Sequence, residues 1–329
     1  MFSIPKSTLQ ILKFIKQCYD FLDELNSISN ISKRVSQNLN LYTYITEELK
    51  IYVNSSSGID DETQADRGLL VTKPFKTLQY ALNFTASRFN LLNFGATILL
   101  ADGEYELNKQ ISLPIYISSS GCITIRSLSG NKQNVKVGKI ASNSRMFYIL
   151  KDLTLNSQYK DSSNNNSCIS CNNYSKTEIY NCDFILENLN SANMYATSID
   201  NKGQFYFKGQ NPINVYIKCP TVVAIFTAAR NSLLSIEQDV NIILTVVSKF
   251  TRGCASSQTG AVIENKLISG RIPKVTSSGE SLTGRYYYIA TNGIIELFTE
   301  ENQTENYFSG NTAGFISLNN GFYITKRSS

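Results

Sequence analysis

The stretch IYVNSSSGIDDETQADRGLLVTKPFKTLQYAL, residues 51–82, begins like a strand, continues through polar residues and then resumes as an amphipathic helix. Pro74 suits the first turn of such a helix, where its missing N–H group is not needed. One face of this helix is predicted to be buried through Leu78, Ala81, Leu82 and Phe89. Directly afterwards, GATILLADGEYEL at residues 95–107 predicts a strand, a glycine turn and a second strand.

From about residue 96 the sequence changes to short β-branched and aromatic runs separated by Asn, Ser and Gly turns. In the second half these runs recur at a step of roughly ten residues, with centres near Phe205, Val215, Val223, Leu233 and Ile243. Two such steps predict a solenoid coil of about 20 residues. A β-sandwich also uses many short strands, but the regular step favours the solenoid.

The first coil of a parallel solenoid has no preceding coil to pair with. Its free backbone groups and its apolar interior would face water and invite edge-to-edge association. We expect the helix after Pro74 to cover this end, with the coils beginning near Ala96. The sequence thus predicts a mainly β chain that forms a parallel β-solenoid with a helical end cap.

The same region resembles the start of pectate-lyase-like right-handed parallel β-helices, especially those of bacteriophage tail spikes and tail fibres. The matching residues are Tyr52, Val53, Asn54, Gly58, Asp60, Pro74, Phe75, Lys76, Thr77, Leu78, Gln79, Ala81, Leu82, Ile98, Leu99, Leu100, Ala101, Gly103 and Tyr105. IYNCDF, residues 179–184, is similar to a coil and turn of that fold. The resemblance covers about residues 51–270 and implies right-handed coils, a place on the virion surface and contact with bacterial surface polysaccharide.

Four segments are predicted along the chain. Residues 1–50 have apolar positions at helical spacing and predict an N-terminal helix, either a coiled coil or an intramolecular hairpin. We prefer the coiled coil, so a homotrimer is expected, with attachment to other virion proteins through this segment. Residues 51–95 are assigned to the cap and residues 96–270 to the β-helix. Residues 271–329 combine alternating strands with Asn-Gly and Gly-rich turns, which predict a separate C-terminal β module that forms a cap or tip.

Composition limits the chemistry that the chain can perform. It has 329 residues, no His, and a net charge of +5 from 31 basic and 26 acidic residues. Without His, imidazole metal sites and Ser-His or Cys-His nucleophilic pairs cannot be built. The basic residues are scattered, so no nucleic-acid partner is expected. We find neither a secretory pattern nor an apolar run of membrane-spanning length, and expect assembly in the host cytoplasm without membrane insertion.

The seven cysteines are an odd number and lack the spacing of a disulfide framework, which indicates a reducing compartment. Cys168 and Cys171 have the spacing of half a zinc site, but no second pair at matching spacing accompanies them. We interpret them as buried strand thiols. Neither a metal nor a cofactor is expected.

Hydrolysis of a polysaccharide needs two carboxylates about 5 to 9.5 Å apart. The catalytic candidates are three acidic residues near strands, Asp183, Glu187 and Asp200. Glu237 and Asp239 form a further acidic pair in SIEQDV. A lyase would need a basic residue instead, and Lys218, Arg230 and Arg252 are candidates by position. The alternative for each of these residues is a solvated charge on the outside of a strand.

The long turn SQYKDSSNNNSC, residues 157–168, interrupts the strand rhythm. Its Asn and Ser side chains can adapt their hydrogen bonds to a ligand, and tyrosine rings present flat faces on which sugar rings can stack. The candidate glycan contacts are therefore Tyr159, Asn164 and Tyr174. A loose, solvated loop is the alternative.

Two functions follow from these expectations. The preferred one is a structural component of a phage particle, a tail fibre or tail spike, that binds a glycan receptor on the host surface. The alternative is a polysaccharide depolymerase, either a hydrolase or a lyase, on the same β-helix. A secreted adhesin is disfavoured by the missing signal and by the unpaired cysteines.

Overall fold

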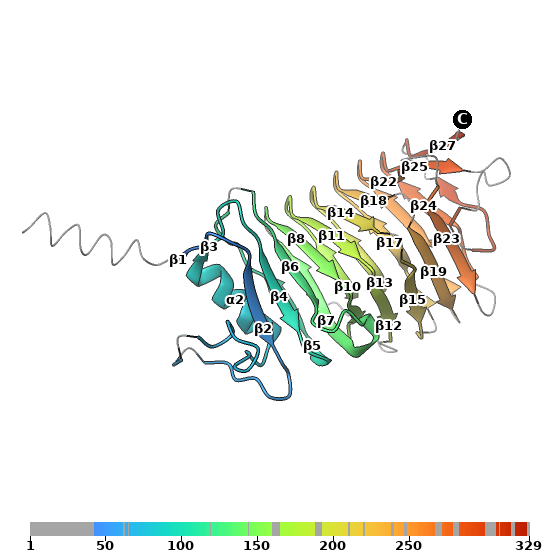
Figure 1. Ribbon diagram of the computed structural model, residues 1–329. Coiled ribbons are helices and arrows are strands. Elements are labelled where there is room, and N and C mark those ends of the chain that lie inside the picture. Colours follow the sequence, from blue (N-terminus) through green and yellow to red (C-terminus); the bar gives the residue numbers. More distant parts are fainter. Residues whose placement is uncertain are drawn as a thin grey trace, which may run out of the picture.

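A computed structural model describes residues 43–327, except 62, 65, 119, 144, 160–164, 188–192, 210, 220, 238–239, 247–248, 267–271, 279–282, 300–306, 309 and 317–319. In this part of the chain the strands stack in sequence order into an elongated parallel β-helix, with one α-helix at the N-terminal end (Figure 1). The predicted fold class, a mainly β solenoid with a helical end cap, is confirmed. None of the helices described is long and apolar enough to span a bilayer.

One face of the β-helix is a ten-stranded parallel sheet. Its strands, in spatial order, are β2 (Leu49–Val53), β4 (Ala96–Leu100), β6 (Ile123–Ser127), β8 (Phe147–Lys151), β11 (Lys176–Tyr180), β14 (Gln204–Lys208), β18 (Leu233–Ile236), β22 (Val262–Asn265), β25 (Ile294–Thr299) and β27 (Phe322–Arg327). We call it the ten-stranded face.

The other two faces belong to one 13-stranded sheet, whose two arms meet at β7 (Val135–Ser142). The first arm contains β9 (Thr154–Asn156), β12 (Asp183–Leu186), β15 (Ile213–Ile217), β19 (Asn241–Val246) and β23 (Lys274–Ser278). The second arm contains β10 (Asn165–Cys171), β13 (Asn193–Ile199), β17 (Ala224–Ala228), β21 (Ala255–Gln258), β24 (Tyr287–Ala290) and β26 (Phe315–Ile316). The long strand β5 (Gly103–Leu113) also pairs with β7.

Smaller elements complete the described chain. β1 (Thr43–Tyr44) pairs with β3 (Phe89–Asn90), and β16 (Thr221–Val222) pairs with β20 (Lys249–Phe250). A short 3-10 helix, η1 (Lys132–Asn134), precedes β7.

Each coil is longer than the sequence predicted. Lys176 on β11 pairs with Gln204 on β14, and Gln204 pairs with Leu233 on β18, so successive coils take 28 and 29 residues. The step of about ten residues between strands is present, but three strands, one for each face, make a coil. The predicted coil of about 20 residues is therefore wrong, because it assumed two faces.

Apolar ladders fill the interior between the three faces. On the ten-stranded face the inward column consists of seven buried residues in register, Ile51, Ile98, Ile125, Leu150, Ile179, Phe207 and Ile236. Phe207 also contacts Phe184 and Phe226, with ring centroids 6.2 and 5.5 Å apart, and Phe226 contacts Phe308. Stacking of like residues buries apolar area in every coil, which is the main stabilising contribution in a solenoid.

The end cap is α2 (Leu78–Arg88), and it covers the interior of the first coils (Figure 1). All four residues of the predicted buried face, Leu78, Ala81, Leu82 and Phe89, are buried. Thr77 is the N-cap residue, and the carboxylate of Asp60 accepts hydrogen bonds from the backbone of Lys76 and Thr77 at 2.8 and 3.0 Å. Glu106 accepts two more from the first turn of α2. The cap is thus fixed by two carboxylates at the positive end of the helix.

The first coil begins before the cap and not near Ala96 as predicted. Residues Leu49–Val53 form β2. It pairs in parallel with β4, although α2 lies between the two strands in the sequence. The predicted helix over residues 1–50 is wrong for residues 43–50, which contain β1 and the start of β2. In β2 the apolar residues Leu49, Ile51 and Val53 alternate with Lys50 and Tyr52, and Ile51 and Val53 are buried. Residues 1–42 and their predicted coiled coil lie outside the described residues.

The described strands of the predicted C-terminal β module, residues 271–329, do not form a unit separate from the β-helix. The strands β24, β25, β26 and β27 all pair in parallel with the preceding coil. The Asn-Gly turn after β24 uses two left-handed residues, Thr291 and Asn292, as do the corners at Asn173–Tyr174 and Arg230–Asn231. Such a corner leads the chain onto the next face without reversing it, so the described C-terminal residues continue the solenoid.

Candidate functional site

The catalytic candidate Asp183 is a buried structural carboxylate. It begins β12 and is fully shielded from solvent. Lys132 forms an ion pair with it at 2.7 Å, Gln133 donates a hydrogen bond at 3.0 Å, and Asn214 donates from its backbone and side chain. Both of its oxygens are bound within the protein, and a sugar could not reach it.

Glu187 and Asp200, the other two candidates, are separated from Asp183 and from each other. Glu187 lies four residues beyond Asp183 along β12, about 13 Å at about 3.3 Å per residue, which exceeds the spacing of a glycosidase pair. Its partner is Lys218 at 3.2 Å. Asp200 lies at a corner after β13, where Arg230 binds both of its oxygens. Two of the predicted lyase bases, Lys218 and Arg230, are therefore partners of the predicted acids.

A carboxylate pair that the sequence analysis missed lies on the outside of the ten-stranded face. Lys208 forms ion pairs with Glu178 at 3.1 Å and with Glu237 at 3.5 Å. Because both oxygens contact the same Nζ, they lie no more than 6.6 Å apart. The predicted companion of Glu237, Asp239, lies outside the described residues. A hollow of about 290 Å³ adjoins this cluster at Tyr180.

The charge state of this cluster favours a structural role. Burial disfavours the charged form of Glu178, but hydrogen bonds from Lys176, Lys208 and Tyr180 outweigh it and lower the pKa of the carboxyl. Burial and the neighbouring Glu178 raise the pKa of Tyr180. Since a glycosidase needs one carboxyl with a raised pKa as its general acid, Glu178 is suited to be an ion-pair partner and not a proton donor.

A second hollow, of about 330 Å³, lies on the outside of the second arm, and we call it the hydroxyl cleft. It is lined by Gln110, Lys139, Asn143, Asn166, Ser167, Ser170, Asn172, Tyr195, Ser198 and Thr227. Nine of these ten side chains are uncharged and polar. Amide and hydroxyl groups can each donate and accept hydrogen bonds, as the hydroxyls of a sugar also require.

Three hydroxyl residues form a row across neighbouring strands of this cleft. Ser170 on β10 pairs with Ser198 on β13, and Ser198 pairs with Thr227 on β17. The hydroxyl of Thr227 is buried and has no hydrogen-bond partner among the described residues. Unsatisfied buried polar atoms are uncommon in folded proteins and call for an explanation. Its oxygen has almost no accessible surface, so a ligand in the cleft would reach it only after the side chains that cover it move.

The cleft follows β10 from Asn166 to Asn172, a length of about 20 Å at about 3.3 Å per residue. The candidate glycan contacts Tyr159 and Tyr174 lie at its two ends. Tyr159 is contacted by Lys139 of the cleft lining, with the Nζ 5.3 Å from the ring centroid. Tyr174 follows Asn172 by two residues and is 47% exposed. The third candidate, Asn164, lies outside the described residues.

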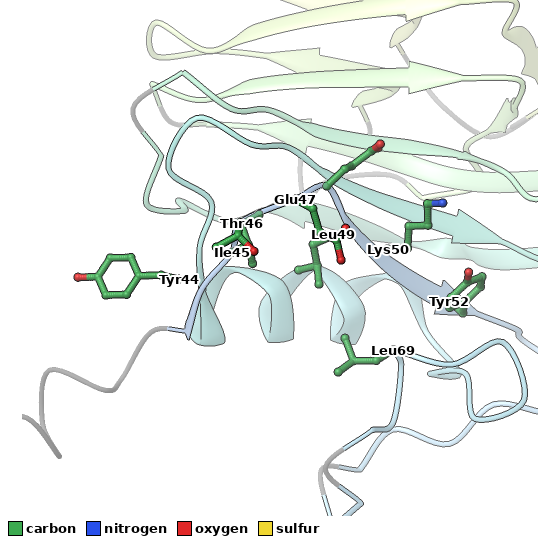
Figure 2. Close-up of a pocket in the computed structure, with 9 residues that line it drawn as sticks. Tyr44, Ile45, Thr46, Glu47, Leu49, Lys50, Tyr52 and Leu69 are labelled. Atoms are coloured by element: carbon green, nitrogen blue, oxygen red, sulfur yellow. The ribbon is translucent and has the colours of Figure 1, made fainter.

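A further cavity, of about 460 Å³, lies where β1 leads into β2 at the N-terminal end (Figure 2). Figure 2 shows Leu49 pointing toward α2 and Tyr44 pointing away from the body. The lining consists of residues 44–50, Tyr52 and Leu69. This cavity offers fewer amide and hydroxyl groups than the hydroxyl cleft, so we do not assign the glycan site to it.

Cys168 and Cys171 are buried free thiols on β10, as interpreted from the sequence. Burial raises the pKa of Cys168 to about 12, which keeps it protonated. Cys171 contacts the hydroxyl oxygen of Ser175 at 3.1 Å. Within the residues that the structure describes, no group of three or more potential metal ligands is present.

No protein-family model and no curated protein matches this chain. Two solved structures are similar to it, and both are pectin methylesterase from Aspergillus niger. The deglycosylated form has a TM-score of 0.46 and 10% identity over 88% of this chain and 87% of that chain. The penultimately deglycosylated form has a TM-score of 0.44 and 10% identity over 84% of this chain and 85% of that chain. The function must therefore be inferred from the residues of this chain.

Proposed function

We propose that the protein binds a surface polysaccharide through the hydroxyl cleft and acts as a non-catalytic, receptor-binding tail fibre or tail spike of a phage. The hollow lined by nine uncharged polar side chains is the observation that carries this proposal. Tyr159 and Tyr174 at the ends of the cleft add rings on which sugars can stack. The phage setting rests on the resemblance of residues 51–105 to the start of tail-spike β-helices.

The cleft suits a polymer better than a small ligand. It is an open hollow along a strand, and pockets for small ligands are usually enclosed and mostly apolar. Its lining repeats from coil to coil, because Ser170, Ser198 and Thr227 are in register. A chain of sugars could therefore meet similar groups at successive coils.

The proposal is tested by binding to bacterial capsular and O-antigen polysaccharides, measured by affinity electrophoresis. Thr227→Val together with Ser198→Ala is expected to weaken binding about tenfold, since each lost hydrogen bond is worth about 0.5 to 1.5 kcal/mol. Thr177→Val is the matched control, because Thr177 also has a buried, unpartnered hydroxyl but lies on an inward column of the ten-stranded face. Equal binding by both variants would contradict the assignment of the cleft.

Polysaccharide cleavage is a second candidate function, favoured by the spacing of Glu178 and Glu237 around Lys208. The non-catalytic function is preferred because both carboxylates are already paired with Lys208, which lies between them. Incubation with a bound polymer decides between the two functions. New reducing ends or new ultraviolet absorbance, lost in Glu178→Gln, would establish cleavage at this pair.

A further inference from the structure

Two cations converge on Tyr174 at the corner between β10 and β11. The guanidinium carbon of Arg145 lies 4.8 Å from the centre of the tyrosine ring, and the Nζ of Lys202 lies 4.9 Å from it. Lys202 also donates a hydrogen bond to the phenol oxygen at 2.8 Å. Both cations are exposed to solvent. The exposed ring of Tyr174 therefore holds the positive charges of Arg145 and Lys202 close together.

These cations have no carboxylate partner among the described residues. Asp200 is two residues before Lys202 in the sequence, but its carboxylate is bound by Arg230 through two nitrogens. Other basic residues on the outside of the β-helix, such as Lys208 and Lys218, are paired with acids. Within the part of the chain that the structure describes, no carboxylate compensates the positive charge of Arg145 and Lys202.

Tyr174 occupies a left-handed corner that recurs from coil to coil. Its φ is +62°, and the equivalent corner positions carry Lys202, Asn231, Gly260 and Asn292, all with positive φ. Among these five positions Tyr174 is the aromatic one, so it is the one that can hold cations against a ring.

The cluster is continuous with the hydroxyl cleft. Asn143 and Asn172, both in the cleft lining, are joined by a hydrogen bond of 2.9 Å. Arg145 follows Asn143 by two residues and Tyr174 follows Asn172 by two residues, so each is within about 7 Å of the cleft along the chain. A polymer lying along β10 would pass from neutral hydroxyl and amide groups to two cations.

We propose that the polysaccharide bound in the hydroxyl cleft is acidic, and that Arg145 and Lys202 bind a carboxylate on one of its sugars beside Tyr174. This inference rests on the proposed function and adds the substrate class. The guanidinium group offers paired donors that match a carboxylate, and Lys202 adds a point charge on the same ring. The neutral part of the cleft would bind the sugar hydroxyls.

The test uses polymers in matched pairs, namely polygalacturonate, hyaluronan, alginate and polysialic acid, each beside its carboxyl-reduced neutral form. Affinity electrophoresis of the full chain is expected to show at least one acidic polymer retained about tenfold more strongly than its reduced form. Arg145→Gln with Lys202→Gln is expected to abolish this preference and to weaken the salt dependence of binding. The matched control, Arg252→Gln with Lys249→Gln, removes the same charge from residues at β20 and just before β21 that do not line the cleft, and is expected to retain the preference.

The outcomes separate this inference from the proposed function. If the reduced and acidic forms bind equally, and Thr227→Val with Ser198→Ala still weakens binding, the cleft is a glycan site and the acidic ligand class is overturned. If the Arg145 and Lys202 variant keeps the preference, the assignment of these two residues is overturned. If no polymer is retained, or binding is unaffected by the Thr227 and Ser198 variant, both proposals fail.

Discussion

At the scale of single residues, Asp183 shows how burial separates a structural carboxylate from a catalytic one. Asp183→Asn would leave the ammonium group of Lys132, which is 15% exposed, without its ion-pair partner. We expect a loss of about 3 to 5 kcal/mol in the free energy of unfolding, measured by urea denaturation, because breaking a buried ion pair leaves an uncompensated charge.

The control for this prediction is Glu187→Gln, which removes the ion pair between Glu187 and Lys218. The side chain of Glu187 is 40% exposed. Exposed pairs contribute little, so the expected loss is less than about 1 kcal/mol. Unchanged stability of Asp183→Asn, combined with lost cleavage of a polymer, would return Asp183 to the catalytic candidates.

Glu178 predicts a dependence of stability on pH. Its ordinary pKa of 4.5 is lowered in the folded protein, although burial opposes this, because Lys176, Lys208 and Tyr180 bind the ionised form. The stabilisation is therefore fully present above pH 4.5 and is lost as the pH falls through the lowered pKa. Glu178→Gln should be less stable than the natural protein at pH 7, and the difference should shrink toward pH 3.

Urea denaturation at pH values between 3 and 7 measures this difference. Glu104→Gln is the control, because it removes a carboxylate whose ion pair with Lys136 is exposed. A constant difference between natural protein and Glu178→Gln across this range would contradict the assigned ionisation of Glu178.

At the scale of secondary-structure elements, α2 closes the end of the solenoid that would otherwise expose β2, β4 and the apolar interior. Leu82→Ala removes a fully buried side chain from the cap, with an expected loss of about 2 to 5 kcal/mol. Asn83→Ala is the control, since Asn83 is the next residue on α2 and is exposed.

Hydrogen exchange of the backbone amides in β2 and β4 is the direct measurement of this effect. We expect Leu82→Ala to accelerate exchange there more than in β14 or β18, because loosening of the cap frees the first coils locally. Light scattering should also rise, since an uncovered strand edge promotes association. Uniform acceleration in all coils would show that α2 stabilises the whole solenoid and not its end.

At the scale of the whole molecule, residues 43–327 contain the described strands of the three faces and the cap α2. Removal of residues 1–42 is therefore expected to leave the β-helix folded, with an unchanged circular dichroism signal of β structure. If residues 1–42 associate as their apolar spacing predicts, the full chain should sediment as a trimer and the truncated chain as a monomer. A monomeric full chain would contradict the predicted homotrimer.

Local sequence patterns determined the elements of this protein. The helical spacing of Leu78, Ala81 and Leu82 sufficed to predict the cap, because an amphipathic helix buries one face wherever it packs. Short β-branched runs sufficed to predict the strands and their step. The buried state of Cys168 and Cys171 also followed from residue type, since free cysteines in strands are usually buried.

Only the tertiary structure decided which residues meet across coils. Residues that contact each other on neighbouring coils are one coil length apart in the sequence. The sequence predicted about 20 residues per coil instead of the observed 28 or 29, so it paired the wrong residues across coils. With the correct length, Ser170, Ser198 and Thr227 align in the sequence, as do Tyr180 and Lys208. The Asn-Gly corners could not be told from hairpins, because left-handed residues serve both turns and only the parallel pairing of the next strand distinguishes them.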